Sequence, residues 1–141
     1  MAGLYDTTTL SKERSSRTYK DLNLSFIANP ATKDIAKLKD VEAVKRSVRN
    51  LIELNHFEKP FHPEIGSDIR NLLFENMSPV IDVAITRAVE DLINAYEPRA
   101  KLIGVKTNPQ YDNNAYEVTI SFYVVGYPEL ITIETMLERV R

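Results

Sequence analysis

Residues 78–98, SPVIDVAITRAVEDLINAYEP, decide how the rest of the chain is interpreted. Ser78 suits a helix N-cap, and Pro79 follows at the first helical position, where its missing N–H group costs nothing. Pro98 ends the pattern. The stretch therefore predicts a long helix that is buried against a sheet or other helices. Its apolar stripe consists of Ile81, Ile85, Ala88, Leu92 and Tyr96, widened by Val89 and Ile93.

Downstream of this helix the hydrophobic period changes to alternation. Strands are predicted around Gly104, over residues 116–124 and over residues 131–134, with turns at residues 108–114 and 126–128. The pattern of residues 135–141 fits either a strand or a helix. We therefore predict an α+β fold, in which helices are followed by a small three-stranded antiparallel meander.

Upstream of the long helix two further helices are predicted, one from the N-cap Asp40 to about Asn55 and a short one from Ser67 to about Asn76. The residues between them read as a structured loop, because prolines fix two φ angles and a glycine permits a conformation closed to other residues. The candidate structural residues of this loop are Pro60, Phe61, Pro63 and Gly66.

The N-terminal third is less regular. Residues 1–20 lack periodicity and are rich in Ser, Thr, Lys and Arg, so we expect a flexible basic tail before a single domain over residues 21–141. The tail is either a solvated segment or an arm that orders on a partner. Residues 21–26 alternate and predict an extended segment with Leu22, Leu24 and Phe26 on the core, and residues 31–39 read as a polar link.

Composition narrows the function classes. A chain of 141 residues, 43% hydrophobic and 27% charged, is ordinary for one globular domain. The absence of cysteine excludes disulfides and thiolate zinc sites. A net charge of −2 argues against nucleic acid as the main ligand, and no apolar run reaches the ~20 residues of a membrane span. We expect no nucleic-acid and no membrane partner.

Motifs for catalysis are missing. The four glycines lie far apart, which excludes a P-loop and a dinucleotide fingerprint, and His56 and His62 lack the spacing of a helical zinc site. We therefore predict no catalytic residue, no metal and no cofactor. Paired carboxylates of a glycosidase remain conceivable, but the sequence places no two of them together. The candidates are Glu64, Glu75, Glu97 and Glu117.

Three features instead suggest contacts with another protein. Glu97, Pro98 and Arg99 form a rigid corner after the long helix, where the charged pair either staples the corner internally or docks a partner. The last strand, with Ile131 and Ile133, has nothing downstream to cover its edge, so the edge is either blunted or accepts a strand. The candidate aromatic anchors, which are equally well ordinary strand residues, are Tyr123 and Tyr127.

Three stretches, in order, resemble the small baseplate wedge protein family of contractile-tailed phages. This family includes the product of gene twenty-five in T-even phages, and the type VI secretion baseplate subunit with the Glu-Pro-Arg motif is related to it. The stretches are residues 21–26 with Asn29-Pro30, residues 59–67 and residues 97–99. Lys59 stands where the family has arginine, which keeps the charge but loses the guanidinium fork.

The resemblance implies a structural, non-enzymatic subunit of the virion, placed in the tail baseplate and assembled in the host cytoplasm. Its implied partners are the wedge core proteins, the tail sheath protein and tube-proximal baseplate proteins. Residues 97–99 would dock on the wedge, and the terminal strands would template sheath assembly. Two alternatives stay open: a peptidoglycan-hydrolysing, lysozyme-like enzyme and a soluble anti-adaptor-like binding protein. A phage, a tailocin and a secretion system all remain possible origins.

Overall fold

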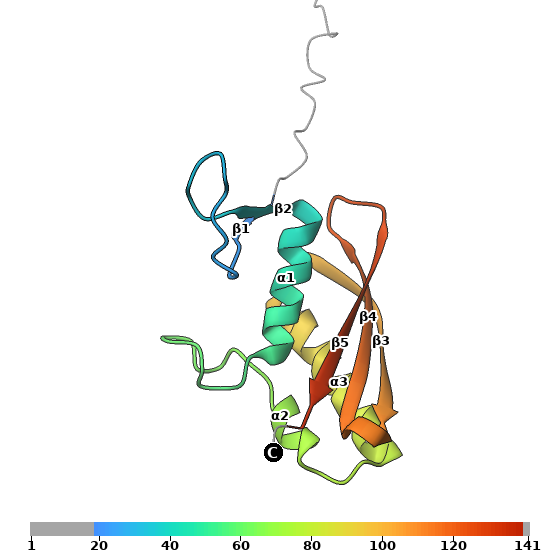
Figure 1. Ribbon diagram of the computed structural model, residues 1–141. Coiled ribbons are helices and arrows are strands. Elements are labelled where there is room, and N and C mark those ends of the chain that lie inside the picture. Colours follow the sequence, from blue (N-terminus) through green and yellow to red (C-terminus); the bar gives the residue numbers. More distant parts are fainter. Residues whose placement is uncertain (1–18, 140–141) are drawn as a thin grey trace, which may run out of the picture.

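The computed structural model describes residues 19–139 as helices packed on one face of a three-stranded sheet (Figure 1). This arrangement confirms the predicted α+β fold with its antiparallel meander. The elements, in chain order, are β1 (Lys20–Leu22), β2 (Lys37–Lys39), α1 (Asp40–Glu53), α2 (Ile69–Leu73), α3 (Pro79–Tyr96), β3 (Ala100–Gln110), a 3₁₀ turn (Tyr111–Asn113), β4 (Ala115–Val124) and β5 (Leu130–Glu138).

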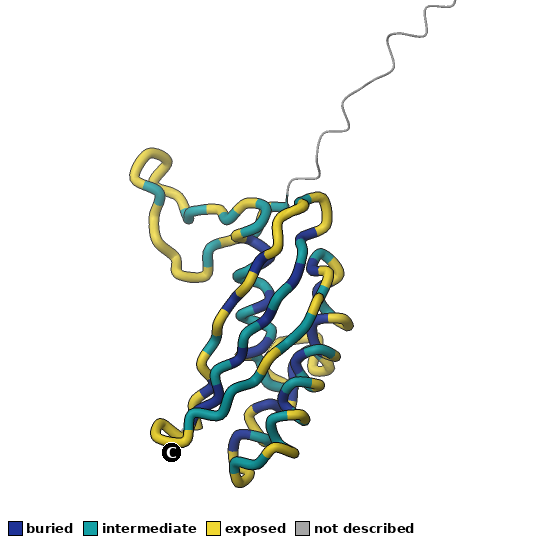
Figure 2. Tube along the Cα trace, turned by 90° about the vertical axis from the view of Figure 1, so that its right-hand side faces the viewer, coloured by how far each residue is buried: buried dark blue, intermediate teal, exposed yellow. Residues whose placement is uncertain are grey.

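The meander has the order β3-β4-β5, so β4 is central and β5 has a neighbouring strand on one side only. Val118, Ile120 and Phe122 of β4 are fully buried, and the residues between them are half-buried on the other face. Figure 2 shows this alternation along the strands. The apolar residues of the alternating pattern are therefore the ones on the face of the sheet that packs against the helices.

Helix α3 forms as the sequence predicts. The Ser78 Oγ accepts a hydrogen bond of 3.5 Å from the backbone N–H of Ile81, and Pro79 is the first helical residue. The helix ends at Tyr96, two residues before Pro98. Its buried side chains join those of α1 and the sheet in one hydrophobic cluster, which includes Val44, Val48, Ile85, Val89, Ile93, Ile120 and Phe122.

The hairpin between β3 and β4 is tighter than predicted. Asn108, Pro109 and Gln110, which we placed in the loop, belong to β3 and pair with β4. The turn is confined to residues 111–114, where Asn114 adopts a left-handed φ of 47°. Pro109 is tolerated because β3 is an edge strand, where one side of the backbone needs no ladder hydrogen bond.

The segment over residues 19–39, which we call the N-terminal ribbon, differs from the prediction. β1 and β2 pair antiparallel, so the polar link predicted over residues 31–39 contains a strand. Leu22, Leu24 and Phe26 are 59%, 50% and 69% exposed and do not lie on the core. Their alternation reflects an extended ribbon that projects away from the sheet (Figure 1). The tail predicted over residues 1–20 lies outside the described residues except for Tyr19 and Lys20.

Two helix ends also differ from the prediction. Asp40 is the first residue of α1 and not its N-cap, which is Lys39. The Asp40 carboxylate instead accepts a hydrogen bond of 3.1 Å from the backbone N–H of Tyr19 and so holds the incoming chain. The short helix α2 ends at Leu73, before the predicted Asn76. At the start of α1 the contact with Tyr19 uses the Asp40 side chain that the sequence assigned to capping. At the end of α2 the chain turns earlier than the sequence pattern predicts.

Candidate docking site

The corner after α3 is an ionic cluster. Arg99 donates from Nε to Glu97 Oε1 at 2.6 Å and from Nη2 to Glu97 Oε2 at 2.8 Å, a bidentate pair. Its Nη1 reaches Asp21 Oδ2 at 3.0 Å, 78 residues earlier in the chain. Arg99 therefore ties the N-terminal ribbon to the end of α3, and the internal pairing that the sequence left open is present.

Burial sets the electrostatics of this cluster. Glu97 is only 2% exposed. Burial by itself raises the pKa of Glu97, but hydrogen bonds from Arg99 and Ser47 and the charge of Arg99 outweigh it, so the pKa lies below its usual value. The pKa of Arg99 is raised, chiefly by its hydrogen bonds to Glu97. Both groups are charged at neutral pH, and Glu97 is a structural carboxylate that partners cannot reach directly.

The loop over residues 54–66 is built around a close approach. Gly66 has a φ of 147°, and a Cβ there would lie 2.5 Å from the backbone C and O of Asn55. Next to it, Ser67 N–H donates to Leu54 O at 3.1 Å and closes the loop. Glu58 accepts hydrogen bonds from the backbone and the side chain of Asn55 at 2.9 and 2.7 Å. These contacts between the two ends of the loop, which we call the loop base, therefore fix its backbone conformation.

A single hydrogen bond ties this loop to the same end of α3. The hydroxyl of Tyr96, the residue before Glu97, donates a hydrogen bond of 2.8 Å to the backbone carbonyl of Glu64. The Arg99–Asp21 pair holds the ribbon at this end as well. All three stretches that carried the family resemblance, although far apart in sequence, thus meet at the C-terminal end of α3.

Both attached segments expose large apolar side chains. In the loop, Phe57 and Phe61 are 85% and 97% exposed, with left-handed φ angles of 69° and 66°. Such angles are rare for bulky residues and cost about 1 kcal/mol or more. Figure 1 shows the ribbon and the loop projecting from α1 on the side away from the sheet. We use the name apolar face for the exposed apolar side chains of these two segments, which lie toward opposite ends of α1 on one side of it; its members are Leu22, Leu24, Phe26, Ile27, Phe57 and Phe61.

The other predicted docking residues lie around the sheet. Ile131 and Ile133 are 6% and 5% exposed and point toward the helices, so only the backbone edge of β5 is available to a partner. Tyr123 is half-buried on the opposite face of β4. Tyr127 is half-buried in the turn after β4, and its hydrogen bond to Asp40 raises the pKa of its hydroxyl. These four residues do not join the cluster at Arg99.

Pro60 and Pro63 lie exposed within the 54–66 loop, as predicted, and Pro98 lies exposed at the corner.

Over residues 19–139 no group of three or more acidic or histidine side chains is arranged to hold a metal ion. None of the helices in the same range has the length and apolarity needed to cross a bilayer.

Comparison with known proteins identifies the family. Residues 39–129 match the model of the family described as baseplate wedge protein gp25. The chain belongs to this family. It is 33% identical to baseplate wedge protein gp25 of Enterobacteria phage T4 over 97 residues. This alignment covers 69% of this chain and 74% of the phage protein.

Two solved structures share the fold. A Geobacter sulfurreducens protein, provisionally named a tail lysozyme, is 18% identical with a TM-score of 0.65 and covers 71% of this chain and 91% of its own. A chain of the anti-feeding prophage baseplate is 21% identical with a TM-score of 0.62 and covers 88% of each. At these identities the likeness establishes the fold alone.

Sequence reasoning missed two partners of the corner. Asp21 was read as the start of an alternating segment, and nothing local marks it as an ion-pair partner of Arg99. Ser47 was not singled out on the α1 pattern, yet it contributes to the lowered pKa of Glu97. A buried carboxylate needs more than one hydrogen-bond donor. This requirement is the only signal in the sequence that could have indicated further neighbours of Glu97 and Arg99.

Proposed function

We propose that this chain is a structural subunit of a baseplate wedge and that it docks on the wedge core through the apolar face. The single observation that supports docking is the exposure of Phe57 and Phe61 on a loop whose backbone is held in an unfavourable conformation. Exposed aromatic side chains on a preformed loop are what a protein–protein interface uses as anchors.

In this proposal Arg99 acts by positioning. It holds the ribbon through Asp21, and the ribbon exposes Leu24 and Phe26 on the same side of α1 as the 54–66 loop (Figure 1). The Glu-Pro-Arg corner therefore contributes to docking indirectly, by fixing the two segments that make contact. Placement of the chain in the tail baseplate follows from its family, and assembly in the host cytoplasm is part of the proposal.

The second part of the proposal concerns the sheath. β5 has a partner strand on one side only, and a strand from the sheath protein can add to its open edge. Because the edge is preformed, the first sheath contacts lose less conformational entropy than two disordered segments would.

The proposed role involves no hydrolysis. A glycosidase needs one carboxylic acid that stays protonated, but the pKa values of Glu97 and Glu64 are both lowered. For Glu64 the main cause is a hydrogen bond from a backbone N–H. Neither residue is suited to act as the acid.

Docking is tested by co-purification of the tagged chain with the wedge core proteins of the same tail. We expect the double variant Phe57→Ser, Phe61→Ser to keep the unfolding midpoint of the wild type but to lose most of the captured wedge core. The matched control is Tyr111→Ser, which removes an aromatic side chain that is 63% exposed at the far hairpin. Equal capture by wild type and the double variant would rule out the apolar face as the docking surface.

A further inference from the structure

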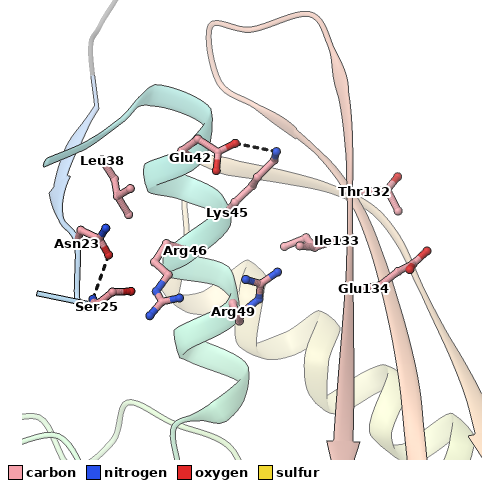
Figure 3. A pocket seen from close by; sticks show the side chains of 10 residues that line it. All are labelled: Asn23, Ser25, Leu38, Glu42, Lys45, Arg46, Arg49, Thr132, Ile133 and Glu134. Atoms are coloured by element: carbon pink, nitrogen blue, oxygen red, sulfur yellow. Dashed lines mark hydrogen bonds and ion pairs between the residues drawn. The ribbon is translucent and has the colours of Figure 1, made fainter. Parts of the chain in front are cut away.

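The open edge of β5 borders a groove of about 660 Å³. Its lining residues come from α1, from β5 and from the N-terminal ribbon, and Figure 3 shows α1 between β5 on one side and the ribbon with Ser25 on the other. Ile133 points across the groove toward the helix, whereas Thr132 and Glu134 point away from it. A strand added to β5 on this side would therefore lie next to α1.

The helix wall of this groove is cationic. Lys45, Arg46 and Arg49 line it. Lys45 forms a partly exposed pair with Glu42 at 2.9 Å, and Arg49 forms no ion pair among residues 19–139. Both side chains lie on the β5 side of α1, whereas Arg46 points toward the N-terminal ribbon (Figure 3). The Arg46 Nε is shielded from solvent and has no hydrogen-bond partner within the described residues. This concentration of positive charge stands out in a chain whose net charge is −2.

We infer that the groove selects an extended segment of a partner protein that carries carboxylates at alternate positions. This inference rests on the proposed role of the β5 edge and adds the chemistry of the strand that it accepts. Alternate side chains of an added strand would face α1, and opposite charge on them would pair with Lys45 and Arg49, which lie on the β5 side of the helix (Figure 3).

The spacing of the two elements fits this segment. Side chains two residues apart on a strand lie about 6.6 Å apart, and positions four residues apart on a helix, such as Lys45 and Arg49, lie about 6 Å apart along its axis. Two carboxylates at positions i and i+2 thus match the two cations of one helix face. The apolar wall at Ile133 and the open strand edge favour a peptide over a nucleic acid.

The test uses the full-length chain and three short synthetic peptides that alternate valine with glutamate, glutamine or lysine. Binding is measured by fluorescence anisotropy, and amide hydrogen exchange reports on β5. We expect the glutamate peptide to bind at least about tenfold more tightly than the glutamine peptide, which corresponds to one charge-assisted hydrogen bond, and the lysine peptide to bind most weakly. The bound glutamate peptide should newly protect the alternate amides of β5 that do not bond to β4.

The matched variants separate the charge from the edge. Lys45→Gln with Arg49→Gln should abolish the preference for glutamate while the glutamine peptide still binds. Arg87→Gln, at an exposed cation of α3, should leave the preference unchanged.

Equal binding of all three peptides with protection of β5 would overturn the charge inference but leave strand addition intact. Absence of binding by every peptide would overturn both. Protection, in the free chain, of the β5 amides that do not bond to β4 would show that a segment of this chain or a second copy fills the edge. Competition by a short thymidine oligonucleotide at equal affinity would reassign the groove to a general polyanion.

Discussion

Arg99 carries the contact that organises the docking surface, because it satisfies a buried carboxylate and holds a segment 78 residues away. Removal of the guanidinium leaves Glu97 buried without its cation, and such a loss costs more than an exposed pair of the same geometry would. Arg99→Gln should therefore lower the free energy of unfolding at neutral pH by about 2–3 kcal/mol.

The pH dependence of this loss has a defined sign. In the wild type the pKa of Glu97 lies below the ordinary 4.5, so the stabilisation is present above pH 4.5 and is lost as the pH falls through the lower value. In Arg99→Gln burial raises the pKa of Glu97, and this variant gains relative stability as the pH falls toward 4.5. Urea unfolding should show the difference between the two proteins shrinking from neutral to acidic pH.

The double variant Glu97→Gln, Arg99→Gln is the control, because it has no carboxylate to titrate at this position. Its stability relative to wild type should not follow the profile of Arg99→Gln. A constant difference between wild type and Arg99→Gln across this pH range would contradict the buried ion pair.

Gly66 offers a second test at the scale of one residue. A Cβ at this position would lie 2.5 Å from backbone atoms of Asn55, so Gly66→Ala should destabilise the chain by about 1–3 kcal/mol. Gly104→Ala is the control, since no atom lies within 4 Å of its Cβ position. Thermal unfolding compares the two, and equal midpoints would show that the loop base is not closely packed.

At the scale of elements, β5 makes the proposed sheath contact with its backbone. Successive N–H groups of a strand point to opposite sides, so Glu134→Pro and Thr135→Pro remove donors from different sides of β5. The variant that loses a donor on the open edge should keep the fold and fail to initiate sheath polymerisation, whereas the other should be destabilised by a lost β4–β5 hydrogen bond. Sheath assembly is scored by electron microscopy. Normal sheath growth on both folded variants would exclude strand addition at this edge.

The sequence predicted the elements whose signals are local. Ser78, Pro79 and Pro98 mark both ends of α3, and the alternation of residues 116–124 marks β4. β1 and β2 could not be predicted in this way, because each has three residues and exists only through pairing with the other. For the site, the sequence predicted the structured loop that contains Phe61 but not the exposure of that side chain. It also did not predict the Arg99–Asp21 pair, since nothing near Asp21 encodes its partner.

For the whole molecule, the arrangement separates two proposed contacts. The apolar face lies on the side of α1 away from the sheet, and the β5 edge lies on the side toward it (Figure 1). One chain can therefore attach to the wedge core and still present a strand edge. Family membership accounts for a baseplate role, and this geometry supplies a physical reason for two partners.

The same view predicts that the purified protein releases no dye from labelled peptidoglycan at any pH between about 6 and 8. The physical reason is that the lowered pKa values of Glu64 and Glu97 leave neither carboxylate protonated to act as an acid. Dye release by wild type that disappears in Glu64→Gln would establish a hydrolase instead.

Cryo-electron microscopy of purified tails tests the central claim most directly, because it locates this chain within the assembled baseplate. We predict that another wedge protein covers Phe57, Phe61 and the N-terminal ribbon, with Arg99 still paired to Glu97 and Asp21. A baseplate in which this face is open to solvent, with the chain attached elsewhere, would contradict the account.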